Sequence, residues 1–184
     1  MKANYDFFNS IDSKEKAYVL GFWCADGYMT IPKQCKTTFS IGFSSCDFEH
    51  LELIKSLIEC EHPIKKRKDN SYRIDIGNKT LGKSLINLGF DTNKSLTAKY
   101  PIIPNKFDSH FIRGVFDGDG CITRGFRKRD RRPYLDVFLC GTENLMKAIN
   151  EKLPENVSVK KQNVNMYKIT YSQKKSVFCI RMDL

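Results

Sequence analysis

The sequence lacks the marks of several protein classes. Its seven cysteines are odd in number and include no CxxC pair and no zinc-like spacing to a histidine. The longest apolar run, residues 17–25, is too short to span a bilayer, and the N-terminus contains no signal-peptide hydrophobic region. These absences argue against a disulfide framework, a zinc site and a membrane protein. We therefore expect reduced, mostly buried cysteines in an intracellular protein whose compartment the sequence leaves open.

Acidic charge is also scarce relative to basic charge. Thirty-one Lys and Arg stand against 21 Asp and Glu, which gives a net charge of +10 in 184 residues. Such an excess must meet an anionic partner or be tolerated as self-repulsion. Nucleic acid is therefore the favoured class of partner. The length fits one compact unit or two small fused ones.

One segment occurs twice in related form. VLGFWCADG at 19–27 and IRGVFDGDG at 112–120 each have an apolar stretch, a central glycine and a terminal Asp-Gly. Strand-like and helix-like apolar spacings follow both copies in the same order, so each half should contain a helix, two strands, a helix, two strands and a helix. The last helices are expected near 80–88 and at 174–184. The predicted division is a first half at 1–92, a proline-containing linker at 93–110 and a second half at 111–184.

Each copy places a glycine in the middle of an expected helix. A glycine there costs about 1 kcal/mol relative to alanine. Gly21 and Gly114 are best explained by the close approach of another backbone, which two copies of the same helix would supply for each other. The terminal Gly27 and Gly120 fit helix C-caps. We therefore predict that the two motif helices pack together at the centre of the molecule.

Asp26 and Asp119 would then meet where the two helices end. Helix C-termini carry partial negative charge that disfavours carboxylates, and a bound cation resolves this conflict. Carboxylate and backbone carbonyl oxygens suit Mg²⁺, and such an ion activates water and stabilises the leaving oxygen in phosphodiester hydrolysis. The sequence therefore predicts a Mg²⁺ site on the two aspartates, where we expect Mn²⁺ to substitute.

Both segments resemble the LAGLIDADG motif of homing endonucleases, including the kind with two motifs in a single chain, and the resemblance covers nearly the whole sequence. It implies an α+β fold of two pseudo-symmetric αββαββα halves whose antiparallel sheets form a DNA-binding saddle. It also implies metal binding by Asp26 and Asp119, helped by the carbonyls of Ala25 and Gly118. A basic residue that the family places near the scissile phosphate corresponds to Lys94, for which a solvated linker lysine is an equally good interpretation.

Two positions depart from the family pattern. Cys24 stands where the second motif has Asp117, at a position that more often packs or caps in the family, so we do not interpret it as inactivation. The place that corresponds to Lys94 in the second half falls beyond Leu184. We therefore expect unequal cleavage rates on the two DNA strands.

Basic and polar residues follow each motif and recur in each second hairpin. Because the expected strands carry apolar residues on one face, their opposite face should form an exposed ribbon that fits a DNA major groove. For any single residue of this set, a solvated position at a hairpin tip is the main alternative. The predicted DNA-binding residues are Lys33, Gln34, Lys36, Thr38, Ser40, Lys65, Lys66, Arg67, Lys68, Arg73, Asp75, Arg124, Arg127, Lys128, Arg129, Arg131, Arg132, Asp136, Lys160, Lys161, Gln162 and Lys168.

Isolated aromatic residues and histidines receive structural roles. Trp23 is most simply a core residue, and Tyr28 is expected to pack in the core or a hairpin. His50, His62 and His110 share no spacing and suggest no partner, so we expect surface or linker positions for them.

The leading hypothesis is a monomeric, Mg²⁺-dependent, site-specific endonuclease that cuts double-stranded DNA and initiates intron or intein homing. Three alternatives compete: an intron maturase with host intron RNA as partner, a nuclease-dead DNA-binding regulator and a general basic RNA-binding domain. The paired carboxylates favour the enzyme over the regulator, because a protein that only binds DNA has no electrostatic reason to keep them beside phosphate. The duplicated motif helix disfavours the RNA-binding domain. The maturase stays open because that activity can coexist with cleavage.

Overall fold

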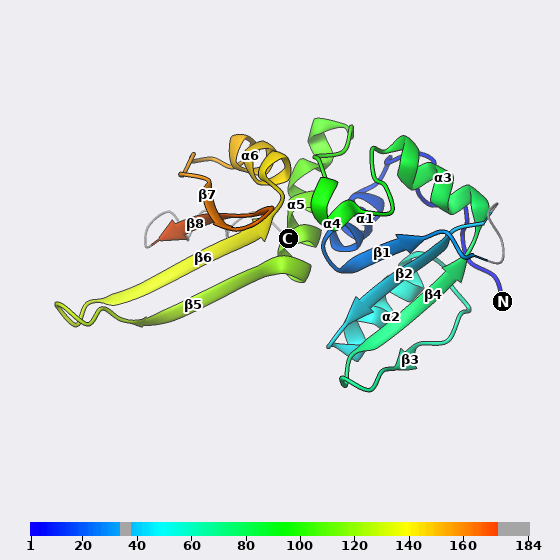
Figure 1. Cartoon of the computed structure of the whole chain (residues 1–184), viewed down its shortest axis with the longest axis horizontal. Helices are drawn as coiled ribbons and strands as arrows, with labels where there is room; N and C mark the ends of the chain where they lie inside the picture. The colour runs from blue at the N-terminus through cyan, green and yellow to red at the C-terminus, as the bar shows by residue number, and fades with distance from the viewer. Residues whose placement is uncertain (34–37, 173–184) are drawn as a thin grey trace.

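Residues 1–33 and 38–172, which this computed structural model describes, contain two copies of one arrangement of helices and strands (Figure 1). The helices are α1 (Lys14–Asp26), α2 (Phe48–Leu57), α3 (Lys79–Asn87), α4 (Lys94–Thr97), α5 (Asp108–Asp119) and α6 (Glu143–Lys152), with a 3-10 helix η1 (Asn105–Phe107). The strands are β1 (Gly27–Thr30), β2 (Ser40–Ser45), β3 (Lys65–Lys66), β4 (Tyr72–Gly77), β5 (Gly120–Phe126), β6 (Pro133–Gly141), β7 (Lys160–Asn163) and β8 (Met166–Ser172).

The element order confirms the predicted α+β fold with two pseudo-symmetric halves. The first half runs α1-β1-β2-α2-β3-β4-α3, and the second repeats this order from α5 to β8. The helix predicted at 174–184 lies outside the described residues, as do Gln34 and Lys36. No helix of the described part is long and apolar enough to cross a membrane.

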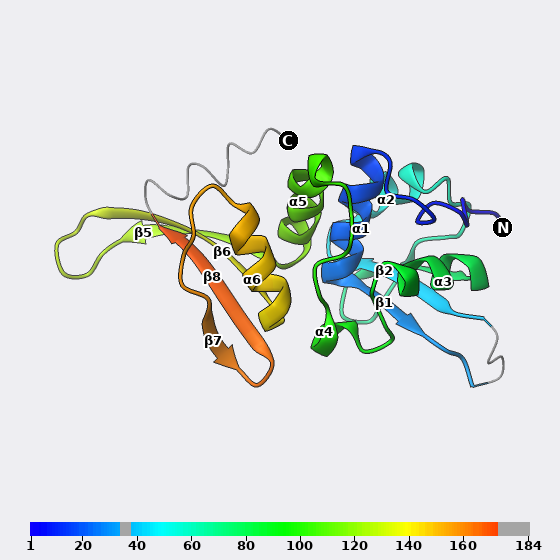
Figure 2. The ribbon, with the colours of Figure 1, turned by 90° about the horizontal axis from the view of Figure 1, so that it is seen from above.

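Each half contains one four-stranded antiparallel sheet. The strand orders are β1-β2-β4-β3 and β5-β6-β8-β7, so the two sheets have the same topology. They extend to opposite sides of α1 and α5, which stand side by side between them (Figure 2). Helix α2 packs on β2 and β4, and α6 packs on β6 and β8. One face of each sheet is therefore covered by a helix, while its other face stays open.

Side-chain caps and apolar spacing place the helices that support the sheets. The Asp47 carboxylate accepts a hydrogen bond from the His50 N–H at the start of α2, and Thr142 caps α6 through the N–H of Leu145. Asp and Thr are both favoured N-cap residues, so ordinary capping chemistry accounts for these two helix starts. Caps of this kind contribute about 1 kcal/mol each and fix where the apolar side of a helix meets its sheet.

The central helices approach each other at the two mid-helix glycines, as predicted. A Cβ built on Gly21 would overlap the carbonyl oxygen of Phe111 and lie 3.0 Å from the backbone nitrogen of Val115. A Cβ on Gly114 would overlap the Tyr18 carbonyl oxygen and lie 2.6 Å from the nitrogen of Phe22. The two helices are therefore in backbone-to-backbone contact, and their C-terminal residues lie near each other.

Three details differ from the sequence-based expectation. Helix α5 begins at Asp108, inside the predicted linker, and α4 lies within that linker as well. Gly27 and Gly120 are the C-cap residues but have φ of −84° and −83°, so they do not use the left-handed conformation. Of the described cysteines only Cys24 and Cys60 are buried, because the others stand on open faces or at an exposed turn.

Candidate active site

Asp26 and Asp119 are the last residues of α1 and α5, the two central helices that pack side by side. A Cβ built on Gly118 would lie 3.4 Å from Oδ2 of Asp26, so this carboxylate rests against the backbone of the opposite helix. Partial burial, and then the charge of Asp119, raise the pKa of Asp26 to about 6, while Lys94 opposes the rise. Desolvation by the surrounding protein atoms also raises the pKa of Asp119, and Lys94 opposes this rise. The residue nevertheless keeps an exposed surface. A carboxylate whose ionised form is destabilised by burial and by a second carboxylate nearby favours a bound cation.

Lys94 is buried next to this pair. Its side chain is only 4% exposed, and its Nζ donates hydrogen bonds to the carbonyl oxygens of Cys24 at 2.8 Å and Ala25 at 3.0 Å. The ammonium therefore neutralises the negative end of α1. Burial lowers the pKa of Lys94, whereas Cys24, Asp119 and Asp26 act in the opposite direction. The alternative interpretation as a solvated linker lysine is wrong, because α4 turns the linker back onto the end of α1.

The seam between the halves is hollow beside these groups. A cavity of about 220 Å³ is lined by Cys24, Lys94, Asp119, Thr142 and Asn165, among others. Its wall is fixed by a hydrogen bond from the Thr142 hydroxyl to the carbonyl oxygen of Ala98, which ties the linker to the second half. Lys94 belongs to the linker, binds the end of α1 in the first half and lines a cavity shared with the second half.

The donor set fits a divalent cation that needs ligands from outside the chain. Within 1–33 and 38–172, no three His, Cys, Asp or Glu side chains gather to hold a metal. Two carboxylates can serve Mg²⁺, which usually takes one or two from the protein and completes its shell with water and substrate phosphates. The carbonyl of Ala25, a predicted helper, already accepts the Lys94 hydrogen bond and keeps one lone pair for a metal. The carbonyl of Gly118 stays a prediction.

The open face of the first sheet carries several of the predicted DNA-binding residues. Ile41, Ile74 and Ile76 are fully buried on the helix side. The strand register therefore places Ser40, Lys65, Arg73 and Asp75 together on the opposite, open face, whereas Lys66 pairs with Tyr72 on the helix side. Thr38 lies two residues before Ser40, so the same alternation places it on the open face.

The open face of the second sheet holds Asp136 and Lys168. Val137, Leu139 and Ile169 point to the helix side. Lys160 pairs with Lys168 and shares its face, whereas Lys161 pairs with Tyr167 and does not. Arg124 pairs with Leu135, so it lies on the face opposite to Asp136. The basic residues at 124–132 therefore do not form one surface, because successive residues of a strand point to opposite faces of the sheet.

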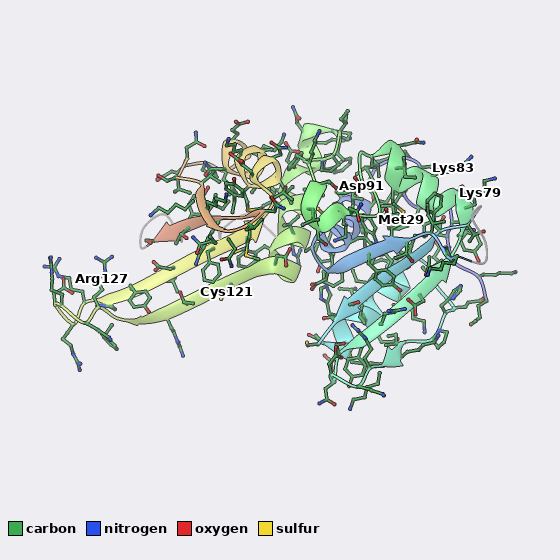
Figure 3. All side chains as sticks on the ribbon, viewed as in Figure 1. Met29, Lys79, Lys83, Asp91, Cys121 and Arg127 are labelled. Carbon is green, nitrogen blue, oxygen red and sulfur yellow. The ribbon has the colours of Figure 1, made fainter. Side chains whose placement is uncertain are left out.

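The remaining predicted basic residues lie at exposed ends. Arg127, Lys128, Arg129, Arg131 and Arg132 are exposed at the tip of the β5–β6 hairpin, which projects far from the central helices (Figure 3). Lys33 is exposed in the segment after β1, Arg67 and Lys68 in the turn between β3 and β4, and Gln162 at the β7–β8 hairpin. The structure does not bring these residues to the carboxylates, and their contact with DNA stays a prediction.

Sequence reasoning missed Tyr28. Its ring lies over Gly42 on the open face of the first sheet, where its hydroxyl donates to Asp75 and the Arg73 guanidinium carbon stands 4.7 Å from the ring centre. The expected packing in a hairpin is confirmed, because the ring lies across the β1–β2 pair, whereas the alternative position in the core is wrong. The alternation of β1 contains the signal, because Met29 is buried and its neighbour must point the other way.

A second missed network joins the halves behind the carboxylates. The Tyr18 hydroxyl donates to Oδ2 of Asp117 at 2.8 Å and lies 2.8 Å from Nε2 of His50. Asp117 therefore serves packing between the helices, as expected for this motif position. His50, for which the sequence suggested no partner, has one across the interface between α1 and α2.

Comparisons with known proteins agree on the fold. No protein-family model matches the chain, and no curated protein matches its sequence. The LAGLIDADG meganuclease I-AabMI, solved with uncleaved DNA, superposes with a TM-score of 0.64 at 16% identity over 87% of this chain and 79% of that one. The homing endonuclease I-LtrWI, solved with its target DNA, gives 0.61 at 16% identity over 98% and 85%.

A third LAGLIDADG homing endonuclease, I-SmaMI, was solved bound to cleaved DNA. It matches with a TM-score of 0.62 at 14% identity over 95% of this chain and 84% of its own. These similarities span both halves, including the crossing of the motif helices. The chain therefore has the fold of the LAGLIDADG homing endonucleases, with both motif helices in one polypeptide.

Proposed function

We propose that this protein is a site-specific endonuclease that cuts double-stranded DNA with a divalent metal, Mg²⁺ in the first place, held by Asp26 and Asp119. The observation that carries the proposal is the meeting of two motif carboxylates, each with a raised pKa, at the ends of paired helices between two open sheets. The structural neighbours support it, since I-SmaMI has also been solved with uncleaved DNA and calcium ions. Nothing in the described residues favours host intron RNA as a partner.

The position of each group of residues indicates its role in such an enzyme. The two open sheets bind the duplex on either side of the central helices and so bring a phosphodiester bond to the carboxylates. A divalent ion there would supply an activated water and charge stabilisation for the leaving oxygen. Lys94 holds a positive charge beside the same point, in a partly enclosed site where charge interactions are stronger than in water.

The experiment that tests this function is digestion of a randomised duplex library in Mg²⁺, followed by sequencing of the new ends. The proposal expects one long, nearly asymmetric sequence around the cut. Tight binding to a defined sequence without new ends would favour a DNA-binding regulator instead.

Metal stabilisation of the free protein should depend on pH. The folded-state pKa of Asp26, about 6, lies above the ordinary value of 3.8, so the metal-free folded protein holds this proton more tightly than the unfolded chain does. The contribution of Asp26 to stability is therefore full at low pH and falls as pH rises through about 6. Because a cation binds the ionised form, excess Mg²⁺ should raise the melting temperature more at about pH 7.5 than at about pH 5.

Differential scanning calorimetry at the two pH values measures this difference. The Asp26→Asn, Asp119→Asn double variant should show little Mg²⁺ response at either pH. An equal Mg²⁺ response of the parent protein at both pH values would contradict a site that contains Asp26.

Replacement of Lys94 by methionine should slow cleavage about 10²-fold or more and leave DNA binding nearly unchanged. Methionine keeps most of the buried stem but removes the ammonium beside the carboxylates. Because Nζ of Lys94 binds the end of α1 and not that of α5, we expect the two strands to be affected unequally. A strand-labelled digestion measures both rates.

Lys99→Met is the matched control, since Lys99 is an exposed lysine of the same linker. It should cut like the parent protein. If Lys94→Met cuts as fast as Lys99→Met, Lys94 has no part in the reaction, and equal nicking rates in the parent would contradict the expected inequality of the strands.

A further inference from the structure

Both sheets hold a cationic side chain against an aromatic ring on the open face. The guanidinium carbon of Arg73 stands 4.7 Å from the centre of the Tyr28 ring, and Nζ of Lys168 stands 3.4 Å from the centre of the Phe138 ring. Such pairs orient a cation and lower its conformational freedom before a ligand arrives. Neither pair is needed for the core, because both lie on the side of the sheet away from the helices.

The two cations occupy equivalent places. Gly27 follows Asp26 and pairs with Phe43, and the next residue of β2, Ser44, pairs with Arg73. In the second half Gly120 follows Asp119 and pairs with Leu139, and the next residue of β6, Cys140, pairs with Lys168. Arg73 and Lys168 are therefore related by the pseudo-symmetry of the halves and flank the carboxylates at the same distance along their sheets.

The rings beneath these cations come from different strands. Tyr28 belongs to β1 and lies over Gly42 of β2, where any Cβ would overlap the ring. In the second half Phe138 takes the place of Gly42, and the small Cys121 takes the place of Tyr28. Each half thus pairs one aromatic ring with one small residue across two strands. In the first half the ring is on the first strand of the sheet, and in the second half it is on the second strand. The same cation-on-ring feature is built by two different sets of side chains.

Arg73 is held more firmly than its counterpart. Its Nε donates to Oδ1 of Asp75 at 2.6 Å, and the Tyr28 hydroxyl donates to the same oxygen. The hydrogen bond to Asp75 engages Nε and not the two terminal nitrogens of the guanidinium. A pair of N–H donors in this fixed plane matches O6 and N7 of guanine in the major groove, and a lysine ammonium can bind the same two acceptors.

We propose that Arg73 and Lys168 each read a guanine, on opposite strands, at equivalent positions of the two half-sites. Tyr28, Asp75 and Phe138 are positioning residues for these cations. The target then contains one symmetric pair of G·C positions within an otherwise asymmetric sequence. The inference rests on the proposed DNA-cutting function, but it concerns which bases are preferred and not whether they are cut.

Selection from the randomised library tests it, with Arg73→Ala, Arg73→Gln and Lys168→Ala compared with the parent protein. Arg73→Ala should reduce the preference for guanine at one position by roughly 5- to 150-fold and leave the other positions unchanged. Lys168→Ala should do the same at the equivalent position in the other half-site. Arg73→Gln should shift the preferred base there from guanine towards adenine.

Variants of the ring test the positioning role without touching Arg73. Gly42→Ala should displace the Tyr28 ring and weaken guanine preference at the Arg73 position alone. Tyr28→Phe keeps the ring and should retain more of the preference than Gly42→Ala. Gly77→Ala is the matched control, since a Cβ there meets nothing within 4 Å.

Two results would overturn the inference. If Arg73→Ala and Lys168→Ala weaken binding equally for all sequences and reduce the salt dependence by about one phosphate each, the residues are backbone contacts. If base preferences are unchanged in both variants, the residues read nothing. If the parent protein binds a defined sequence but does not cut it, only the proposed function is refuted. Selection by binding can then still measure the base preferences of the variants. A parent with no sequence preference refutes both.

Discussion

Asp26→Asn and Asp119→Asn should each slow strand cleavage by about 10³-fold or more while DNA affinity stays within a few-fold of the parent. Asparagine keeps the size of the side chain but removes the charge that holds a cation. The two carboxylates belong to different halves and lie at the ends of the paired helices, so loss of either removes one of the two proposed side-chain ligands. Single-turnover cleavage of the selected target in Mg²⁺ measures the effect.

Asp117→Asn is the matched control for this pair. Asp117 lies two residues before Asp119 on the same helix but accepts a hydrogen bond from Tyr18, which an amide oxygen can also accept. Its cleavage rate should stay close to that of the parent. If Asp117→Asn is as slow as Asp119→Asn, the loss reflects altered helix packing, and the assignment of the metal ligands fails.

Gly21→Ala or Gly114→Ala should strongly destabilise the protein. The added Cβ would overlap a backbone carbonyl oxygen of the facing helix, and backbone cannot rotate away as a side chain can. We expect a loss of about 3 kcal/mol or more in the free energy of unfolding, at or above the upper range for overpacked cores. Urea unfolding measures it.

Gly77→Ala, where a Cβ meets nothing within 4 Å, should change the free energy of unfolding by less than about 1 kcal/mol. If the central glycine variants unfold at the same urea concentration as Gly77→Ala, the helices do not meet backbone to backbone. The separation and direction of the carboxylates would then need another explanation.

The central part of this fold could be predicted from sequence because local rules and symmetry agree there. A glycine in an apolar helix has few explanations, and finding it twice with the same Asp-Gly ending identified both the packing partner and the end of each helix. The helix starts at Asp47 and Thr142 use side chains that are favoured N-caps, which is a local property of the sequence. These features depend on neighbours in the sequence.

The features that sequence reasoning missed depend on contacts between distant segments. The burial of Lys94 follows from the path of the linker, which Thr142 fixes from the second half. The alternation of β1 puts Tyr28 on the open face, but the packing of its ring depends on Gly42 of another strand, which leaves room for it. Arg124 was expected on the open face with Asp136 but lies on the opposite face. The register of β5 with β6 determines this position, and composition alone does not reveal that register.

The central claim is that Asp26 and Asp119 together hold the divalent ion that supports cleavage. Anomalous diffraction from Mn²⁺ in crystals of the complex with target DNA measures this directly. The account predicts anomalous peaks within roughly 2 Å of carboxylate oxygens of both residues and of a DNA phosphate between them. Peaks that touch neither aspartate, in a complex that cleaves its DNA in Mn²⁺, would contradict it.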